Sequence, residues 1–340
     1  RRFVVATGSG PFVPPIPGLD AVPYLTNETI WDLRTAPKHL LIIGGGPIGM
    51  EMAQAHRRLG SEVTVIEGAK ALGRDDPEAA EIVLARLRQE GVHVIEGQSA
   101  AEVTGAAGAI AVQLEDGHSV EGSHLLVAVG RAVNLDRLDL DAAGVKHTRN
   151  GVTVGPDLRS VSNRRVYAVG DAAGGLQFTH LAGYHAGVVI RSILFGLPSK
   201  SRTDHVPRVT YTDPELAQVG LTEAEAKKEY GLRLNVVRAS MGENDRAIAE
   251  GKTDGFAKIM VVGGRPVGAT IIGHNAGELI GLWALALANK LKMSQISNTV
   301  LPYPTLNEVS KRAAGDYFTP KLFGNPRVKQ VVGFVQRFLP

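Results

Sequence analysis

The sequence has 340 residues, of which 44% are hydrophobic and 21% are charged, so it is long enough for two or three domains with cores of their own. Its net charge of +3 comes without basic clusters interleaved with aromatic residues, which argues against a nucleic-acid partner. The absence of cysteine excludes disulfides and thiolate chemistry within these residues, and no metal site is predicted. No apolar run approaches the roughly 18 residues of a membrane span and no signal peptide is evident, so the expected location is the cytoplasm.

The first expected element is a short apolar strand, Phe3 to Ala6, which we predict to be buried. The small-residue turn Thr7-Gly8-Ser9-Gly10 follows at its carboxyl end, where ligands bind in open α/β sheets. A plain loop is an equally good interpretation of this turn alone. Because a core strand directly after Arg1 and Arg2 is an unusual start for a domain, we expect the chain to be the remainder of a longer protein.

The stretch that follows predicts a strand, a glycine turn, a helix and a second strand. Leu40 to Ile43 form a continuous apolar run, as in a parallel strand buried on both faces. Gly44-x-Gly46-x-x-Gly49 opens the helix, and the second strand ends at Glu67, 18 residues after Gly49. The glycines let backbone approach a pyrophosphate, and Glu67 stands where an acid accepts hydrogen bonds from an adenosine ribose. A dinucleotide site is therefore predicted, with a purely structural glycine turn as the alternative.

Further elements of the same α/β domain follow the second strand. We expect a helix from Asp76 to Glu90, a third strand from Val92 to Ile95 and a β-hairpin around Asp116-Gly117. The apolar strand Leu125 to Val129 ends in Gly130-Arg131. An arginine in this position beside a nucleotide site either contacts phosphate, which we favour, or lies in solvent.

A loop-like segment from Ala132 to Leu158 precedes another apolar strand, Asn163 to Asp171, which ends in Gly170-Asp171. Asp171 could accept hydrogen bonds from polyol or ribose hydroxyls, or serve as an N-cap or turn residue. The next helix, Gln177 to Phe195, carries His180 and His185 near its start. We expect both histidines to be packed, hydrogen-bonded residues rather than catalytic bases or ligands.

The character of the chain changes near Pro198, where a polar linker precedes strands that alternate or pair locally. These strands are expected at Arg208–Tyr211, Leu232–Ala239, Phe256–Val262 and Val267–Ile272. Thr222-x-x-Glu225 predicts a capping box at a helix start, and Ala276 to Lys290 predicts a strongly apolar helix. This is an α+β module of antiparallel strands, and its apolar helix is expected to bury against something, with a partner subunit as the natural candidate.

Two helices are expected in the last 40 or so residues. Pro304 fits the first turn of the first one, which leaves Tyr303 just outside it and Glu308 about one turn in. The tail from Asn325 to Leu339 predicts an amphipathic helix with basic residues between its apolar ones. Such a helix could lie on a membrane surface, but packing on its own body or on a partner is the favoured interpretation.

Six motifs occur along nearly the whole chain. They are ATGS (6–9), GGGPIGME (44–51), AVGRAVN (128–134), VYAVGD (166–171), YTDPELAQVGLTE (211–223) and PTLNE (304–308). Their types and order resemble the class I family of flavin-dependent pyridine nucleotide–disulfide oxidoreductases, to which dihydrolipoamide dehydrogenase, glutathione reductase and mercuric reductase belong. The resemblance implies α/β Rossmann-like domains that bind FAD and NAD(P), followed by a C-terminal α+β dimerisation domain, and hence a homodimer.

The resemblance also implies domain boundaries and site residues. The FAD domain would comprise 1–36 and 132–203, the NAD(P) domain 37–131, the dimerisation domain 204–320 and an amphipathic tail 321–340. FAD would be contacted by Thr7, Gly8, Ser9, Gly170, Asp171, Gln177, Phe178, Thr179 and His180. NAD(P) would be held by Gly44, Gly45, Gly46, Pro47, Ile48, Gly49, Glu51, Glu67, Gly130 and Arg131. A carboxylate at Glu67 would repel a 2′-phosphate, so NAD is favoured over NADP.

Catalytic roles are implied for three residues, Glu51, Tyr303 and Glu308. In the family the glutamate at the position of Glu51 pairs with a lysine beside the flavin. The disulfide reductases place a histidine where this chain has Tyr303, and that histidine and the glutamate at Glu308 form their acid–base pair. A phenol titrating at about pH 10 is a poor general base at neutral pH, so ordinary dihydrolipoamide dehydrogenase activity is not expected.

Two family features are not found in this sequence. The family's other GxGxxG, which grips the ADP part of FAD, and its CxxxxC redox pair would precede Arg1, so the chain by itself is expected to be inactive and to show little flavin absorbance. The tyrosine resembles that of mercuric reductase and its relatives and of soluble transhydrogenase, but the C-terminal cysteine pair of mercuric reductase is missing here.

The preferred hypothesis is an NAD(P)H-dependent FAD flavoprotein oxidoreductase of the mercuric-reductase-like branch. Hydride would pass from nicotinamide to flavin and on to a disulfide, a metal or another small-molecule acceptor. Tyr303 and Glu308 of one subunit would shape the acceptor site of the other. One alternative is a soluble NAD(P) transhydrogenase-like flavoprotein, and a second is a non-catalytic module that binds a nucleotide and dimerises.

Overall fold

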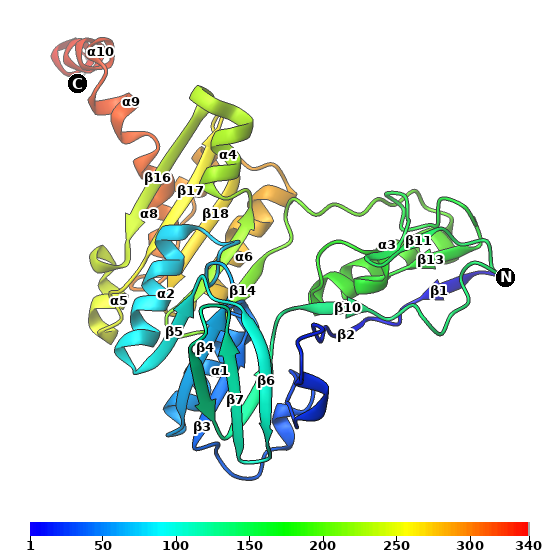
Figure 1. Cartoon of the computed structure of the whole chain (residues 1–340). Coiled ribbons are helices and arrows are strands. Elements are labelled where there is room, and N and C mark those ends of the chain that lie inside the picture. Colours follow the sequence, from blue (N-terminus) through cyan, green and yellow to red (C-terminus); the bar gives the residue numbers. More distant parts are fainter. Residues whose placement is uncertain (339–340) are drawn as a thin grey trace. The chain divides into compact units, whose positions relative to one another are not determined.

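The computed structural model describes residues 1–338, and their contacts divide the chain into two compact units (Figure 1). The first unit comprises residues 1–71 and 90–203, and the second comprises residues 72–89 and those from 204 onward. The helix predicted at 76–90 therefore belongs by its contacts to the second unit, although it lies in sequence between two strands of the first.

The first unit is built on a four-stranded parallel sheet. Its strand order is β5–β4–β3–β9, with β5 at Val92–Glu96, β4 at Glu62–Glu67, β3 at His39–Ile43 and β9 at His124–Val127. Strand β3 pairs in parallel on both edges, and α1 (Pro47–Arg58) packs on β3 and β4. Leu40 to Ile42 are consequently fully buried. This confirms the prediction of a parallel strand that needs no polar side chain on either face.

An antiparallel sheet, β6–β7–β8, extends the same unit. Its strands are β6 (Ala100–Ala106), β7 (Ala109–Leu114) and β8 (Ser119–Gly122). The turn at Asp116-Gly117 joins β7 to β8, as predicted, because Gly117 adopts the positive φ that this hairpin requires. Strand β6 was not predicted.

The remaining elements of the first unit are short strands and one long helix. Strand β1 (Phe3–Val5) pairs with β13 (Val166–Ala168), and β2 (Ser9–Pro11) pairs with β10 (Arg131–Val133). Strands β11 (His147–Thr148) and β12 (Gly151–Val152), the one-turn helices η1 (Leu19–Ala21), η2 (Ile30–Asp32) and η3 (Gly170–Ala173), and α3 (Thr179–Phe195) complete it.

Two expectations for this part of the chain are wrong. The opening strand is not buried, since Phe3 is 62% exposed, because β1 belongs to a sheet of only two strands. The segment from 132 to 158 is not all loop, because β10, β11 and β12 find antiparallel partners there.

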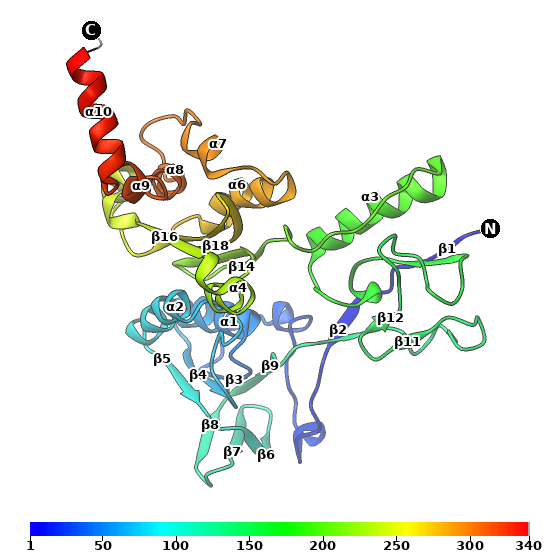
Figure 2. The same ribbon diagram turned by 90° about the horizontal axis from the view of Figure 1, so that it is seen from above.

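The second unit contains a five-stranded antiparallel sheet with helices on both faces. Its order is β14 (Arg208–Thr210), β15 (Glu215–Gly220), β18 (Arg265–Gly273), β17 (Phe256–Val262) and β16 (Leu234–Ser240). Helices α2 (Pro77–Gln89) and α4 (Glu223–Tyr230) cover one face, while α6 (Ala276–Ala288), α7 (Met293–Ser297) and α8 (Glu308–Asp316) cover the other (Figure 2). The fully buried Trp283 of α6 lies in this second core. The α+β prediction is confirmed.

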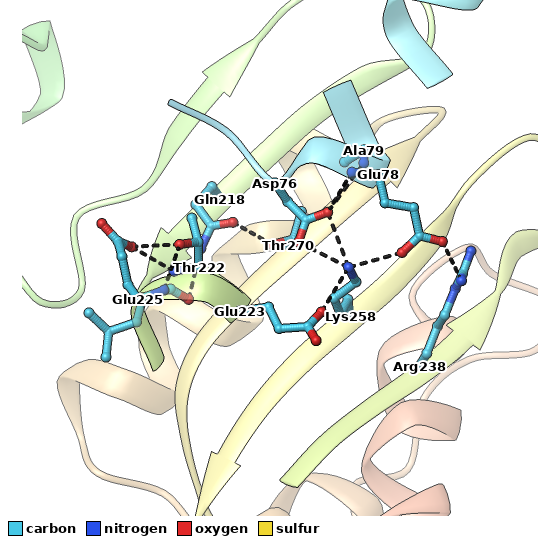
Figure 3. A network of polar contacts seen from close by, with 11 residues as sticks. Asp76, Glu78, Ala79, Gln218, Thr222, Glu223, Glu225, Arg238, Lys258 and Thr270 are labelled. Atoms are coloured by element: carbon cyan, nitrogen blue, oxygen red, sulfur yellow. Dashed lines mark hydrogen bonds and ion pairs between the residues drawn. The ribbon is translucent and has the colours of Figure 1, made fainter. Parts of the chain in front are cut away.

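An ion cluster around Lys258 fastens α2 to this sheet (Figure 3). The Lys258 ammonium, whose side chain is only 7% exposed, lies 3.0 Å from Asp76 Oδ2, 2.9 Å from Glu78 Oε2 and 3.1 Å from Glu223 Oε2. Asp76 also accepts the backbone N–H groups of Glu78 and Ala79, so it caps the first turn of α2. Burial alone would lower the pKa of Lys258, but hydrogen bonds to Glu78, Asp76 and Glu223 outweigh it and raise the pKa.

Helix α5 (Asp245–Glu250) lies between β16 and β17 in the sequence. Helices α9 (Thr319–Phe323) and α10 (Pro326–Phe338) follow α8. No residue of α10 is buried, so packing of its apolar side on its own body, one of the favoured interpretations, is not observed. Within residues 1–338, no helix has both the length and the apolar character required to cross a bilayer.

Candidate cofactor and acceptor sites

In the turn between β3 and α1, two of the three glycines of the Gly44-x-Gly46-x-x-Gly49 motif cannot carry a side chain. Gly44 has φ +111°, and a Cβ on it would lie 2.5 Å from the carbonyl oxygen of Ala128. A Cβ on Gly49 would lie 2.0 Å from the carbonyl oxygen of Gly44. At Gly46, by contrast, a Cβ would meet nothing within 4 Å. The turn is therefore closely packed at Gly44 and Gly49 and open at Gly46, by the N-terminus of α1. This open backbone fits the approach of a pyrophosphate.

Glu67, the last residue of β4, lies against this turn, and its predicted hydrogen bond to a ribose stays a prediction. Its Oε2 accepts the Gly45 N–H at 2.7 Å, and its Oε1 accepts the Ala69 N–H at 2.9 Å. An ionised carboxylate offers about four lone-pair sites, so these bonds leave capacity for a ribose hydroxyl. Pro47 starts α1, whose first turn holds no acidic residue, and the half-buried Glu51 follows in the same helix. The role of Glu51 beside a flavin stays a prediction.

Arg131, Ser9 and Asp171 meet in a polar cluster of the first unit. Arg131 Nε donates to Ser9 Oγ at 2.7 Å, and its Nη2 donates to the Ser9 carbonyl at 2.5 Å. Ser9 Oγ in turn donates to Asp171 Oδ2 at 2.5 Å, which lies 4.0 Å from Arg131 Nε. The structure thus brings together three predicted site residues that are far apart in sequence. The guanidinium of Arg131 contacts Ser9 and lies near Asp171, and its contact with a phosphate of NAD(P) stays a prediction.

The backbone beside this cluster is accessible. A Cβ on Gly8 or on Gly130 would meet nothing within 4 Å, and both glycines have positive φ, +64° and +135°. Thr7 and Gly8 are held by Asn134, which donates its side-chain N–H to the Thr7 carbonyl and its backbone N–H to the Gly8 carbonyl. An open glycine backbone with a carboxylate nearby fits the hydroxyl-rich ribityl chain of a flavin.

His185 supports the turn that carries Asp171. Its Nδ1 accepts the Gly170 N–H at 3.2 Å, and the residue is only 4% exposed. Burial lowers the pKa of His185, so the imidazole is neutral and Nδ1 can act as an acceptor. This confirms the expectation of a packed, hydrogen-bonded residue for His185. The same expectation is wrong for the packing of His180, which stands exposed in the first turn of α3.

The residues predicted to line the isoalloxazine ring stand at the start of α3. Gln177 and Phe178 precede the helix, and Thr179 and His180 are its first two residues. The rings of Phe178 and His180 stack with centroids 5.1 Å apart and planes 9° apart. Gln177 and Phe178 are half-buried, whereas Thr179 and His180 are exposed. Contact of these residues with a flavin stays a prediction.

Tyr303, in the second unit, is a hydrogen-bond donor. Its hydroxyl donates to Asp245 Oδ2 at 2.8 Å, and the residue is 70% exposed. The hydrogen bond to Asp245 raises the pKa of Tyr303 above 10, and the charges of Asp245 and Glu308 act in the same direction. The phenol therefore stays protonated at neutral pH, which strengthens the argument that it does not serve as a general base.

The prediction that Pro304 opens a helix is wrong, because α8 begins only at Glu308. Residues 304–307 form a bend instead, in which the Thr305 N–H approaches Glu308 Oε2 at 3.4 Å. Asn244 holds the bend from outside, since its Nδ2 donates to the carbonyls of Thr305 and Leu306 at 3.2 Å each. Asn244 and Asp245 were not predicted as site residues, and the signal for them in the sequence was an N-cap pattern at the start of α5.

Comparison with known proteins adds a family assignment to this geometry. Residues 1–186 match the family described as pyridine nucleotide-disulphide oxidoreductase, and residues 206–314 match its dimerisation domain. A mercuric reductase of Lysinibacillus sphaericus is 36% identical over 321 residues, which cover 92% of this chain and 58% of the relative. A mercuric reductase of Bacillus cereus is 35% identical, with 92% of this chain and 50% of the relative covered. The chain thus spans little more than half the length of these curated relatives.

Solved structures give the same result for the fold. LpdA from Mycobacterium tuberculosis superposes with a TM-score of 0.86 at 29% identity, covering 92% of this chain and 69% of LpdA. The HOCl-induced flavoprotein disulfide reductase RclA from Escherichia coli superposes with a TM-score of 0.84 at 28% identity, covering 92% of this chain and 73% of RclA.

Proposed function

Because the chain belongs to the pyridine nucleotide-disulphide oxidoreductase family, we propose that it works as an NAD(P)H-dependent flavoprotein oxidoreductase. The family is FAD-dependent and uses NAD(P)H. Bound FAD would supply the two-electron carrier between the nicotinamide and the final acceptor, which no side chain of this protein can replace. The observation that carries the proposal is the open glycine turn with Glu67 hydrogen-bonded at its edge.

The residues of the chain have binding and orienting roles in this proposal. The N-terminus of α1 and the open backbone at Gly46 hold the pyrophosphate of the nicotinamide nucleotide. Glu67 accepts a hydrogen bond from the adenosine ribose, and its charge disfavours the 2′-phosphate of NADP. The cluster of Ser9, Arg131 and Asp171 binds the hydroxyl-rich part of FAD, with Arg131 balancing the charge of Asp171.

The acceptor site is proposed to form in a homodimer, through the domain that matches the family's dimerisation domain. Tyr303 and Glu308 of one subunit would shape the site that serves the other. Because its phenol is protonated, Tyr303 donates a hydrogen bond and orients the acceptor instead of removing a proton from it. The acceptor class in this proposal is a disulfide, a metal ion or another small oxidant.

The test compares two glutamates of the same strand, Glu67 and Glu62. We expect Glu67→Ala to weaken NADH binding about tenfold, the value of one charge-assisted hydrogen bond, and to shift the preference toward NADPH. Glu62→Ala, at the exposed start of β4, should bind NADH like the wild type. Binding is followed by the fluorescence of the reduced nicotinamide, and turnover by NADH oxidation with added FAD and a dye acceptor. Equal affinities in the two variants would refute the assignment of Glu67.

The same assay separates the alternatives. Hydride transfer from NADPH to an NAD analogue, without a dye, would favour a transhydrogenase. Tight NADH binding with no oxidation under any of these conditions would favour a non-catalytic nucleotide-binding module.

A further inference from the structure

Helix α10 has an apolar face that nothing in its own unit covers. We call this the tail face: Val331, Val332, Phe334, Val335 and Phe338, each between 42% and 62% exposed. Val331, Val335 and Phe338 are spaced by four and three residues, and Val332 lies one position from Val331, so they form one stripe along the helix. The rings of Phe334 and Phe338 touch along the stripe, with centroids 4.7 Å apart. Figures 1 and 2 both show α10 beyond α9, away from the five-stranded sheet.

The charge of this segment has one sign. From Tyr317 to the last residue the sequence contains Lys321, Arg327, Lys329 and Arg337 but no aspartate or glutamate. These four charges exceed the formal net charge of +3 of the whole chain, so the basic character of the protein is concentrated here. Lys329 and Arg337 lie on the side of α10 opposite the centre of the tail face, together with Gln330 and Gln336.

These observations select one occupant for the tail face. A second α10 would bring the three positive charges of Arg327, Lys329 and Arg337 against three like charges, which disfavours pairing of the tail with itself. The match to the family's dimerisation domain ends at residue 314, so the dimer of that domain does not account for α10. An anionic lipid surface complements both features, because it offers negative headgroups to the basic side and an acyl boundary to the apolar side.

We propose that α10 docks this protein on the surface of anionic membranes. The 13 residues of the helix span about 20 Å, too short for the roughly 30 Å of a bilayer core, so the helix lies along the surface. The tail face enters the acyl boundary, and Lys329 and Arg337 contact the phosphates of the headgroups.

The test is flotation of the full chain with vesicles of phosphatidylcholine alone or mixed with phosphatidylglycerol. We expect binding to the mixed vesicles only. The double variant Lys329→Gln/Arg337→Gln should bind them about 25-fold more weakly, at a factor of about five per charge, and added salt should have a similar effect. The double variant Val331→Ser/Val335→Ser should lose about tenfold or more through the lost apolar contact.

Matched controls come from elsewhere in the second unit. Leu232→Ser removes a fully exposed apolar side chain, and Lys228→Gln removes an exposed charge on α4; neither should change flotation. Equal binding to both kinds of vesicle, or no binding to either, would overturn the proposal. If Val331→Ser/Val335→Ser lowers the molar mass in light scattering, the tail face binds a second copy; if it lowers the urea midpoint of the second unit, the face packs on its own body. Either result also overturns the proposal.

Discussion

Helices α1 and α2 follow one another in the sequence with a single strand between them, yet they are held in place by opposite means. Helix α1 approaches the strand before it because Gly49 has no Cβ, and the contact is made by backbone atoms. Helix α2 belongs to the other unit, where the charge of Lys258 fastens it through Asp76 and Glu78 and also pairs with Glu223 of α4. The position of α1 depends on the absence of a side chain at Gly49, and that of α2 depends on the positive charge of Lys258. The two helices should therefore respond differently to substitution, pH and salt.

The largest effect is expected from Lys258→Met. Removing the ammonium leaves three carboxylates facing one another, and breaking a buried ion pair costs about 3–5 kcal/mol. Because Glu78 and Glu223 are each 42% exposed, we expect a loss near the lower end, about 3 kcal/mol. Trp283 is fully buried in the second unit, so its fluorescence in a Trp31→Phe background reports urea unfolding of that unit alone.

The control for this variant is Lys252→Met. Lys252 pairs with Asp213 at 3.6 Å but is 39% exposed, so its removal should cost about 0–1 kcal/mol. If the two variants prove equally stable, the ion cluster is not what holds α2.

The pKa of Lys258 is raised, so the stability that its charge contributes is complete below the unfolded pKa of about 10.4. This stability is lost as the pH rises through the higher folded value.

Gly49→Ala tests the other side of the comparison. Its Cβ would lie 2.0 Å from the Gly44 carbonyl oxygen, so α1 must shift, and we expect the first unit to lose about 1–3 kcal/mol together with NADH affinity. Hydrogen exchange of residues 39–58 as a function of urea measures this stability. The loss should not change with salt.

Gly46→Ala is the matched control, because its Cβ meets nothing within 4 Å. Stability should stay unchanged while NADH binding weakens, since the methyl group lies where the pyrophosphate approaches. Unchanged NADH binding in Gly46→Ala would place the nucleotide elsewhere.

The same contrast explains how far the sequence could be interpreted. The glycine turn and Glu67 were predictable because strand, turn, helix and acid are neighbours in the chain and their geometry is local. The Lys258 cluster was not, because residues near positions 76, 223 and 258 meet only after the antiparallel sheet has formed. Its one signal was a lysine inside the apolar run of β17, where a charge needs partners.

Asn244→Ala should have an intermediate effect. It leaves the carbonyls of Thr305 and Leu306 without this donor and removes the acceptor of the Ala247 N–H, which together cost about 1–2 kcal/mol. Asn235→Ala is the control, since Asn235 is exposed and its side chain donates to the nearby carbonyl of Arg233. Urea unfolding followed by Trp283 measures both. An equal cost in the two variants would mean that Asn244 does not hold the bend.

The bend at 304–307 also marks a limit of prediction. Pro304 is a good first residue for a helix, so a local rule places the helix start there. Asn244 and Asp245 lie about 60 residues earlier and hold the bend and the Tyr303 hydroxyl, and the sequence does not reveal this pairing. The sequence motif identifies Tyr303 and Glu308 as candidate site residues, but the backbone conformation around them depends on Asn244, which is distant in sequence.

The smallest effect is a pH dependence of the first unit, which the backbone contact of α1 should not produce. Burial lowers the pKa of His185, so below the unfolded value of about 6.5 the unfolded chain binds a proton that the native state does not. The stability of the turn at Gly170 and Asp171 is therefore complete above this pH and declines as the pH falls toward 5.

His185→Asn keeps an acceptor for the Gly170 N–H without titrating, so it should remove this decline of stability with falling pH. His118→Asn, at an exposed hairpin, should leave the decline unchanged. Urea-dependent hydrogen exchange of residues 163–175 at several pH values measures the slope, and an unaltered slope in His185→Asn would assign it to another group.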